Sequence, residues 1–367
     1  MEYRTLPHGG ERFSVMGLGL GSISEITDAT MEEVFEYAAA HGINYFDLVG
    51  GTLDVFRAFG RVFRTQRDKV HTQMHFGGIY DNDEKYGMSR DLPAIQRTFD
   101  RLLEETGLGY TDMGYFHCVG READFEQIMQ GGLFDYVCRM KEQGLVHHIG
   151  FSSHSPVVAN RFLDTGVIDM CMFSINPAYD YSKGAYGYGQ VDERQRFYQR
   201  CQQMGVGIAV MKPFCAGQLL DAQRSPLGVA LTREQCLQYA LDRPGVLVCL
   251  PGVRGLQDVK DALTFFDAPP EARDYSILGS VTPEDAYGRC VYCNHCQPCP
   301  MGIDVGLVNK YYDLARMGDE LARRHYEKLT RKADACVGCG HCERQCPFQV
   351  KQVSRMAEIN EYFSNIK

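Results

Sequence analysis

The chain has 367 residues, of which 44% are hydrophobic and 23% are charged, and its formal net charge is −9. This composition is typical of a globular protein, and the acidic balance argues against a nucleic-acid partner. No apolar run approaches the ~18 residues that a membrane span needs, and the first residues lack the apolar segment of an export signal, so we expect a cytoplasmic protein with no membrane partner.

The first 265 residues alternate short apolar strands with amphipathic helices. Strands are predicted at 15–21, 43–49, 69–76, 111–119, 147–153, 168–176, 207–214 and 245–253. Helices are predicted at 31–40, 55–64, 93–105, 123–141, 156–164, 192–203, 232–242 and 256–266. Eight such units favour a (β/α)8 TIM barrel over residues 1–270, with an open doubly wound sheet as the alternative.

Polar side chains fall where these strands end. They are Asp47, His75, His117, Ser152, Ser153, Asn176, Lys212 and Arg254. In a barrel of this kind the chemistry lies at the carboxyl ends of the strands. Asp47, His75 and His117 end three consecutive strands, so we predict that they lie together in a catalytic site. The alternative for each histidine is a core residue with its hydrogen bonds satisfied.

A stretch of tyrosine and glycine, AYDYSKGAYGYG at 178–189, follows the sixth predicted strand. It lies at the catalytic end and has the composition of an aromatic loop. Such a loop could clamp a flat substrate or supply a phenol, or it could be a loop without function. The residues alone leave these alternatives open.

Eight of the fifteen cysteines form two tight groups after residue 289, and the other seven are scattered as small hydrophobic residues. The second group, Cys336-x2-Cys339-x2-Cys342-x3-Cys346-Pro347, has the spacing of a bacterial ferredoxin. The first, Cys290-x2-Cys293-x2-Cys296-x2-Cys299-Pro300, is one residue shorter. We predict two [4Fe–4S] clusters in a mainly α ferredoxin-like domain over 271–367, with a helix at 304–332 between the groups. Zinc, the alternative metal, explains two four-cysteine runs poorly.

The fourth cysteine of each ferredoxin run ligates the other cluster. If this crossing holds, one cluster has the ligands Cys290, Cys293, Cys296 and Cys346. The other cluster then has the ligands Cys336, Cys339, Cys342 and Cys299.

Several segments in order resemble the aldo/keto reductases, specifically those with a C-terminal 4Fe–4S ferredoxin-like domain. They are RTLPHGGERFSVMGLGLGS, GINYFDL, YTDMGYFHC, HHIGFSSHS, MKPFCAG, LPGVRGLQDV, CPMGID and CVGCGHCERQCP. The resemblance implies a barrel that reduces carbonyls with a nicotinamide bound across its mouth.

The family's catalytic tetrad of Asp, Tyr, Lys and His is only half present. Asp47 and His117 match the aspartate and the histidine, whereas Thr52 and His75 occupy the places of the tyrosine and the lysine. A threonine hydroxyl is far too weak an acid to replace the phenol. A histidine can donate a proton near neutral pH. We therefore predict that the Asp47–His75 pair is the proton source and that His117 orients the substrate.

The resemblance also implies a nicotinamide site. Ser152 and Ser153 match the residues that contact the carboxamide, whereas Met172 replaces a family glutamine. Lys212, Gly252 and Arg254 lie where phosphate contacts would fall, and NADP(H) is therefore a second expected cofactor. Solvated charges at loop ends are the alternative interpretation.

The leading hypothesis is an iron–sulfur oxidoreductase that reduces a small organic substrate at the carboxyl-terminal mouth of the barrel. Its electrons would pass through two [4Fe–4S] clusters from a ferredoxin-type donor or from NADPH. One alternative is a non-catalytic electron-transfer or redox-sensing protein with a decayed barrel. Another is an NADPH-dependent carbonyl reductase whose clusters are purely structural.

Overall fold

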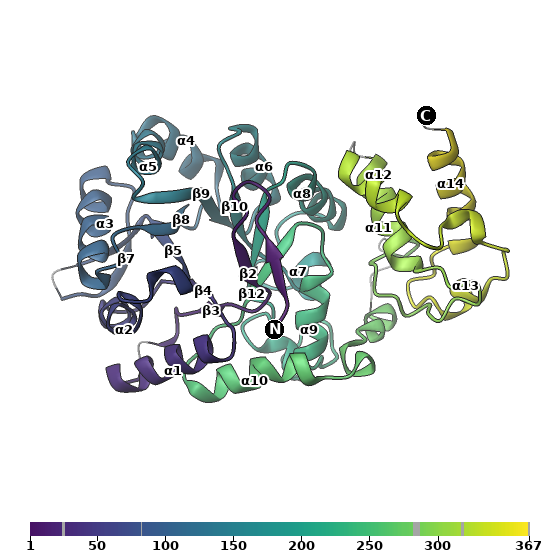
Figure 1. Cartoon of the computed structure of the whole chain (residues 1–367), viewed down its shortest axis with the longest axis horizontal. Coiled ribbons are helices and arrows are strands. Elements are labelled where there is room, and N and C mark those ends of the chain that lie inside the picture. Colours follow the sequence, from purple (N-terminus) through teal and green to yellow (C-terminus); the bar gives the residue numbers. More distant parts are fainter. Residues whose placement is uncertain (24–25, 82, 282–286, 317–318, 366–367) are drawn as a thin grey trace.

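The computed structural model describes residues 1–23, 26–81, 83–281, 287–316 and 319–365. Its larger part is a barrel of eight parallel strands (Figure 1). In spatial order they are β3 (Leu18–Gly19), β4 (Tyr45–Asp47), β5 (His71–Phe76), β8 (Thr111–Phe116), β9 (Val146–Ser153), β10 (Met170–Ser174), β11 (Gly207–Met211) and β12 (Val246–Leu250). Bridges from Met16 to Cys249 and from Gly19 to Gly252 join the first strand to the last, so the sheet closes as the eight-unit pattern predicted.

Helices cover the outside of the barrel, and polar side chains begin several of them. Thr27, Asp91, Ser155 and Thr232 each accept a hydrogen bond from a backbone N–H of the first turn, which satisfies a donor that the helix itself leaves unpaired. The helices are α1 (Asp28–Ala40), α2 (Asp54–Phe63), α3 (Leu92–Thr106), α4 (Glu122–Gln130), α5 (Leu133–Glu142), α6 (Pro156–Asp164), α7 (Pro177–Asp180), α8 (Val191–Gln203), α9 (Arg233–Leu241) and α10 (Leu256–Asp267). Two 3-10 turns, η2 (Arg67–Lys69) and η3 (Gln218–Leu220), lie in the connections.

The structure differs from the sequence prediction in three parts of the barrel. The single helix predicted at 123–141 is wrong, because Gly131 and Gly132 separate α4 from α5 and Gly132 has a φ of 79°. The chain begins with an antiparallel hairpin of β1 (Tyr3–Thr5) and β2 (Arg12–Ser14) that was not predicted. A second such hairpin, β6 (Gly78–Tyr80) with β7 (Tyr86–Met88), follows β5 directly.

The barrel has two hydrophobic layers. Side chains that point inward from the strands, among them Tyr45, Met113, Tyr115, Met170 and Leu250, form one buried cluster. A larger cluster fills the space between the strands and the surrounding helices. The barrel interior is thus a packed core, which leaves the strand ends and their loops to build a site.

A second, mainly helical domain follows η4 (Pro270–Arg273) and η5 (Ser276–Ser280), and lies beside the barrel (Figure 1). It contains α11 (Val305–Arg316), α12 (Glu320–Glu327), η7 (Ala333–Ala335), α13 (His341–Gln345) and α14 (Gln352–Asn365). The helix predicted at 304–332 is therefore two helices, and residues 317–318 between them lie outside the described residues.

A buried arginine joins the two domains. Arg243 follows α9 and is 3% exposed, and its guanidinium donates to the carbonyl oxygen of Val291, in the first cysteine group, and to the hydroxyl of Tyr275. Lys310 on α11 donates to the carbonyl oxygen of Asp242. These contacts attach the first cysteine group directly to the barrel.

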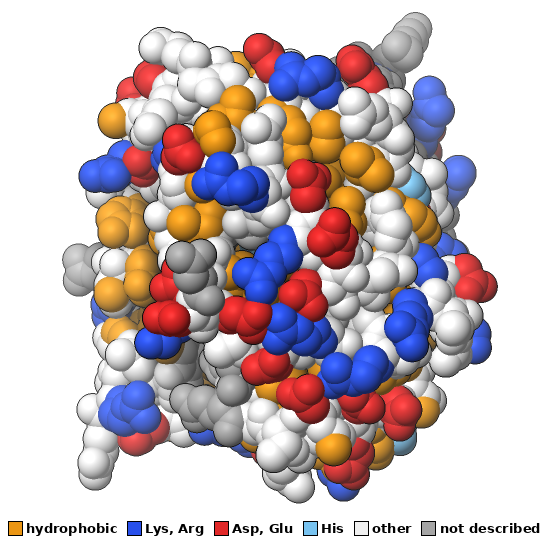
Figure 2. Space-filling model, turned by 90° about the vertical axis from the view of Figure 1, so that its left-hand side faces the viewer, with side chains coloured by type: hydrophobic (Ala, Val, Ile, Leu, Met, Phe, Trp, Pro, Cys, Tyr) orange, Lys and Arg blue, Asp and Glu red, His pale blue; other side chains and the backbone are white. Residues whose placement is uncertain are grey.

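The face of the barrel that points away from this domain carries acidic and basic side chains interleaved with each other (Figure 2). Between α2 and α3, Arg57 pairs with Glu84 at 2.7 Å and with Glu105 at 2.8 Å. Ion pairs near the surface are screened by solvent and contribute little to stability. Within the described residues, no helix combines the length and the apolar character needed to cross a membrane.

Candidate functional site

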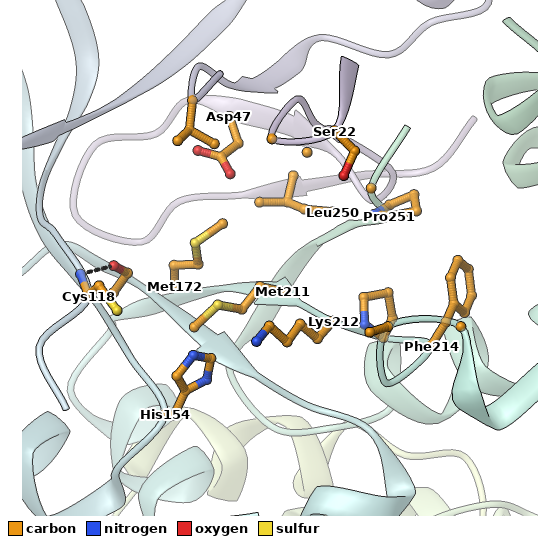
Figure 3. Close-up of a pocket in the computed structure, with 18 of the residues that line it drawn as sticks. Ser22, Asp47, Cys118, His154, Met172, Met211, Lys212, Phe214, Leu250 and Pro251 are labelled. Carbon is orange, nitrogen blue, oxygen red and sulfur yellow. Dashed lines mark hydrogen bonds between the residues drawn. The ribbon is translucent and has the colours of Figure 1, made fainter. Parts of the chain in front are cut away.

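A cavity of 740 Å³ opens at the carboxyl ends of the barrel strands. It is lined by every residue that the sequence predicted for catalysis or nicotinamide binding: Asp47, His75, His117, Ser152, Ser153, Lys212, Gly252 and Arg254. Figure 3 shows Asp47 and Lys212 on opposite sides, with Met172 and Met211 between them. The structure brings the predicted residues together, while the role of each stays a prediction.

The carboxylate and the first imidazole form a buried pair. Asp47 at the end of β4 and His75 near the end of β5 are 4% and 9% exposed, and Asp47 Oδ1 lies 2.6 Å from His75 Nε2. Gln73, two residues before His75, donates its amide N–H to the same carboxylate oxygen at 2.9 Å. Neighbouring parallel strands in register, with Asp47 opposite Gln73, place these groups side by side. A carboxylate in this position holds the imidazole in one orientation.

His117 extends the pair into a chain of four side chains. Its Nδ1 lies 3.0 Å from His75 Nδ1, and its Nε2 lies 2.5 Å from the hydroxyl of Tyr86. Burial, with added repulsion from His75 and Arg90, lowers the pKa of His117 to about 2, so its imidazole is neutral at physiological pH. Burial also raises the pKa of Tyr86 to about 12, so the phenol keeps its proton.

Tyr86 is the residue that the sequence analysis missed. Thr52, at the place of the family tyrosine, hydrogen-bonds to Asp54 at the start of α2. The backbone N–H of Tyr86 donates to the carbonyl oxygen of Gly51, so β7 brings a phenol beside the position that lacks one. The available signal was a short polar segment between two tyrosine-containing stretches, at 80–87, which is typical of a hairpin.

The predicted nicotinamide residues have partners within the protein. Ser152 Oγ accepts from the backbone N–H of Cys118 at 2.7 Å, and Ser153 Oγ donates to the carbonyl oxygen of Val119 at 2.6 Å. Arg254 pairs with Asp258 through two N–H groups, each at 3.0 Å. A Cβ added at Gly252 would meet nothing within 4 Å, so this residue borders open space.

Tyr186 of the tyrosine-rich loop packs against the cavity wall. The Lys212 ammonium lies 3.2 Å from the centre of the Tyr186 ring, and the ring of His154 lies 4.5 Å from it. Burial lowers the pKa of Lys212 and lowers that of His154 to about 3. A cation held over an aromatic face is stabilised electrostatically, so this loop covers the basic side of the cavity.

The eight cluster cysteines line two separate hollows in the second domain. The first hollow is lined by Cys290, Cys293, Cys296 and Cys346. The second is lined by Cys299, Cys336, Cys339 and Cys342. The fourth cysteine of each run thus lies with the first three of the other run, which is the crossed grouping that the sequence suggested.

The chemistry of the two hollows fits iron–sulfur clusters. Burial raises the pKa of Cys290 to about 12 and that of Cys293 to about 11, so these thiols need a cationic partner to become ligands. His341 lines the second hollow, and its Nε2 is buried and has no hydrogen-bond partner among the described residues.

The two hollows differ in their distance from the barrel. Three of the four cysteines of the first hollow, Cys290, Cys293 and Cys346, pack against the main hydrophobic cluster, which contains the barrel core. The fourth, Cys296, lies with Cys299, Cys336 and Cys342 in or against the separate core of the second domain. Next to the second hollow, Cys339 is exposed and Val337 is 64% exposed. One site therefore adjoins the barrel and the other reaches the surface.

Comparison with known proteins matches both parts of the chain. Residues 15–235 match the model of the aldo/keto reductase family, and residues 286–350 match the model of a 4Fe-4S dicluster domain. Among solved structures, the fold is similar to that of an aldo-keto reductase from Bacillus halodurans in its holo form. The identity is 18%, the match covers 74% of this chain and 94% of that one, and the TM-score is 0.59.

A protein from Pseudomonas aeruginosa classed among the aldo-keto reductases is also similar. The identity is 18%, with 72% of this chain and 94% of that chain covered and a TM-score of 0.57. At this identity the similarity establishes the barrel fold, while the chemistry has to be argued from the cavity and the two hollows.

Proposed function

Because the chain belongs to the aldo/keto reductase family and carries a 4Fe-4S dicluster domain, we propose that it is a reductase of a small carbonyl compound whose electrons arrive through two [4Fe–4S] clusters. The observation that carries this function is the arrangement of the two hollows. One adjoins the barrel, while the other reaches the surface beside the exposed Cys339. An electron relay from an external donor requires one redox centre at the surface and a second between it and the barrel.

A hydrogen-bonded connection runs from the barrel-side hollow into the barrel wall, to the loop after β10. Arg243 donates to the carbonyl oxygen of Val291, and its Nε donates to the carbonyl oxygen of Tyr239 at 3.0 Å. The Tyr239 hydroxyl donates to Asp180 at 2.9 Å, and Asp180 ends α7 directly after β10. This continuous buried contact supports electron transfer between the two parts of the protein.

Reduction of a carbonyl to an alcohol consumes two electrons and two protons. The clusters, when bound, each carry one electron, and a low-potential ferredoxin-type protein is the reductant. The chain itself supplies acids beside the cavity. Asp47 and His75 are hydrogen-bonded at 2.6 Å, and His117 lies next to them, in a site where general acid catalysis is worth ~10²–10⁴-fold.

The surface near the second hollow fits an acidic donor. Residues 323–351 contain seven Lys or Arg and three Asp or Glu, a net charge of +4, although the chain as a whole carries −9. Lys328, Arg331, Arg344 and Lys351 are exposed, and Arg344 donates to the carbonyl oxygen of the exposed Cys339. A basic surface steers an acidic partner by attraction that salt screens.

Anaerobic purification with iron and sulfide analysis tests the cluster content. About eight irons per chain, with bleaching of the visible spectrum by reduced ferredoxin and none by NADPH, are expected. Four or fewer irons after reconstitution would overturn the two-cluster relay. Turnover is then measured with benzaldehyde and a panel of ketones and enones, with photoreduced ferredoxin as donor.

Charge reversal tests the donor surface. Arg331→Glu and Arg344→Glu should each lower the bimolecular rate of reduction by ferredoxin several-fold at low salt, with little difference at high salt. Lys69→Glu is the matched control, because Lys69 is exposed on η2 of the barrel. Equal rates for all three variants and the unaltered protein would place the donor elsewhere.

A second candidate is an NADPH-dependent carbonyl reductase with structural clusters. It is favoured by the size of the cavity, 740 Å³, and by the presence of Ser152, Lys212 and Arg254 on its wall. It predicts benzaldehyde reduction by NADPH at a rate that does not change when the clusters are held oxidised. A decayed barrel is disfavoured by the same intact cavity and by the buried Asp47–His75 pair.

A further inference from the structure

We propose that Tyr86 is the entry point of a proton relay that runs through His117 and His75 to Asp47 in the cavity. This role presupposes the reductase function proposed above and deepens it, because the reaction consumes protons in a buried site. The four groups follow one another at 2.5 Å, 3.0 Å and 2.6 Å. Each separation is within hydrogen-bond length.

The protonation states make this chain directional. The Tyr86 phenol keeps its proton and His117 is neutral, so either group could donate at this contact. The Asp47 carboxylate at the other end of the chain selects the direction in which the phenol donates to His117 Nε2. A neutral imidazole has one donor and one acceptor, and the single proton of His117 is therefore on Nδ1, which donates to His75 Nδ1. The proton of His75 is then on Nε2, which donates to the carboxylate of Asp47.

The opposite direction is disfavoured in the resting state. If His117 Nε2 donated to Tyr86, the proton of His75 would have to be on Nδ1. His75 Nε2 would then direct a lone pair at an ionised carboxylate oxygen 2.6 Å away, unless Asp47 were protonated. That second state is the one left after a proton has moved along the chain to Asp47.

The two ends of the relay have the environments that proton entry and delivery require. Tyr86 is 36% exposed and can exchange protons with water, whereas Asp47 is 4% exposed and lines the cavity. Arg90, Cys118 and Asp47 are the charged or titratable groups that act on the phenol. The β6–β7 hairpin holds the ring in place, because the Tyr86 backbone N–H donates to Gly51 and Gly78 pairs with Met88.

One transfer moves one proton and breaks and forms equal numbers of bonds. The phenol O–H breaks as an N–H forms at His117 Nε2, the Nδ1 proton of His117 passes to His75 Nδ1, and the Nε2 proton of His75 passes to Asp47. The solvent supplies a proton to the phenol oxygen in the same transfer, so no free phenolate forms, and Asp47 then gives its proton to the substrate oxygen. Both imidazoles have exchanged tautomers, so each must rotate or exchange with water in the cavity before a second proton follows.

Removing one hydroxyl group tests the relay in the holoprotein. Tyr86→Phe keeps the ring but not the proton, and Tyr80→Phe is the matched control, since Tyr80 lies on the same hairpin and its hydroxyl donates to Gly50. With benzaldehyde and photoreduced ferredoxin, we expect Tyr86→Phe to lower kcat by ~10–10²-fold at unchanged KM and to alter the solvent isotope effect. In Tyr86→Ala, added phenols should restore turnover, the more acidic phenols more strongly, which a merely structural ring would not produce.

Histidine tautomers give a readout that does not depend on turnover. In protein labelled with 15N-histidine and with oxidised clusters, NMR should find His117 protonated at Nδ1 and His75 protonated at Nε2. A His117 protonated at Nε2 in the resting protein, or a kcat for Tyr86→Phe within twofold of the Tyr80→Phe control, would overturn the relay. Absence of turnover with any carbonyl compound in the unaltered holoprotein would instead refute the proposed function, and the tautomers would still decide the relay.

Discussion

Double substitution of cysteines tests the crossed cluster sites more sharply than any single change. Cys346 is the last cysteine of the second run, but it lies in the hollow of Cys290, Cys293 and Cys296. If this hollow holds one cluster, Cys290→Ser and Cys346→Ser damage the same cluster. Cys336→Ser and Cys346→Ser damage different ones, because Cys336 lines the other hollow.

The expected iron counts follow directly from this grouping. Four thiolates line each hollow, and a cubane cluster holds about four irons, so the unaltered chain should contain about eight. The Cys290→Ser/Cys346→Ser variant should keep about four irons, and the Cys336→Ser/Cys346→Ser variant should keep close to none. After burial, the pKa of Cys296 is raised most by Cys290, Cys293 and Cys346 of its own hollow and less by Cys342 of the other hollow, and Cys336 and Cys299 raise the pKa of Cys342.

The assay is iron and acid-labile sulfide analysis after anaerobic purification, with electron paramagnetic resonance of the dithionite-reduced protein to count the remaining clusters. Cys249→Ser is the matched control, because Cys249 is a buried thiol of β12 that lines neither hollow. The crossed assignment is refuted if the counts are reversed, with about four irons left in Cys336→Ser/Cys346→Ser and almost none in Cys290→Ser/Cys346→Ser.

Three other predictions concern single residues. His75→Gln should lower the rate of the chemical step by ~10²–10⁴-fold in a single-turnover assay, and unchanged turnover would exclude the Asp47–His75 pair as proton source. In the second hollow, Nε2 of His341 is positioned to donate a hydrogen bond to the bound cluster. His341→Phe removes this bond, worth about 1 kcal/mol, and should make the reduction potential of that cluster more negative by ~40 mV in a redox titration. An unchanged potential would exclude the hydrogen bond. Burial raises the pKa of Asp112, but hydrogen bonds from His71 and the charge of Arg67 outweigh it and lower the pKa to about 2. This depressed pKa gives stability that is present above pH ~4 and is lost as the pH falls to ~2. In urea titration at pH 7, Asp112→Asn should therefore lower the free energy of unfolding by about 2 kcal/mol. A loss below about 0.5 kcal/mol, roughly the scatter of a surface substitution, would contradict this prediction.

Local patterns in the sequence were sufficient for the barrel and for the cluster cysteines. Eight successive strand–helix units close into a barrel of parallel strands. Because the strands are parallel, Asp47, His75 and His117 lie at the same end of the barrel. The spacing of the cysteine runs depends on the geometry of a cubane, which is the same wherever it is bound. Both are short-range signals. The structure has the barrel and places the eight cysteines in two groups of four, while their ligation of clusters stays a prediction.

The sequence could not determine which phenol stands beside His117. Thr52 occupies the expected position, while Tyr86 reaches the histidine from a hairpin, 31 residues before it in the chain. Nothing in the residues around Tyr86 encodes that contact, because it depends on how β7 pairs with β6 and how its backbone meets Gly51. The placement of the second domain was likewise undetermined, since it depends on one buried guanidinium, Arg243, and on the apolar surface around it. Such contacts depend on the packing of the whole chain, and tertiary structure therefore decided which groups stand beside the cavity and where the two cysteine hollows lie.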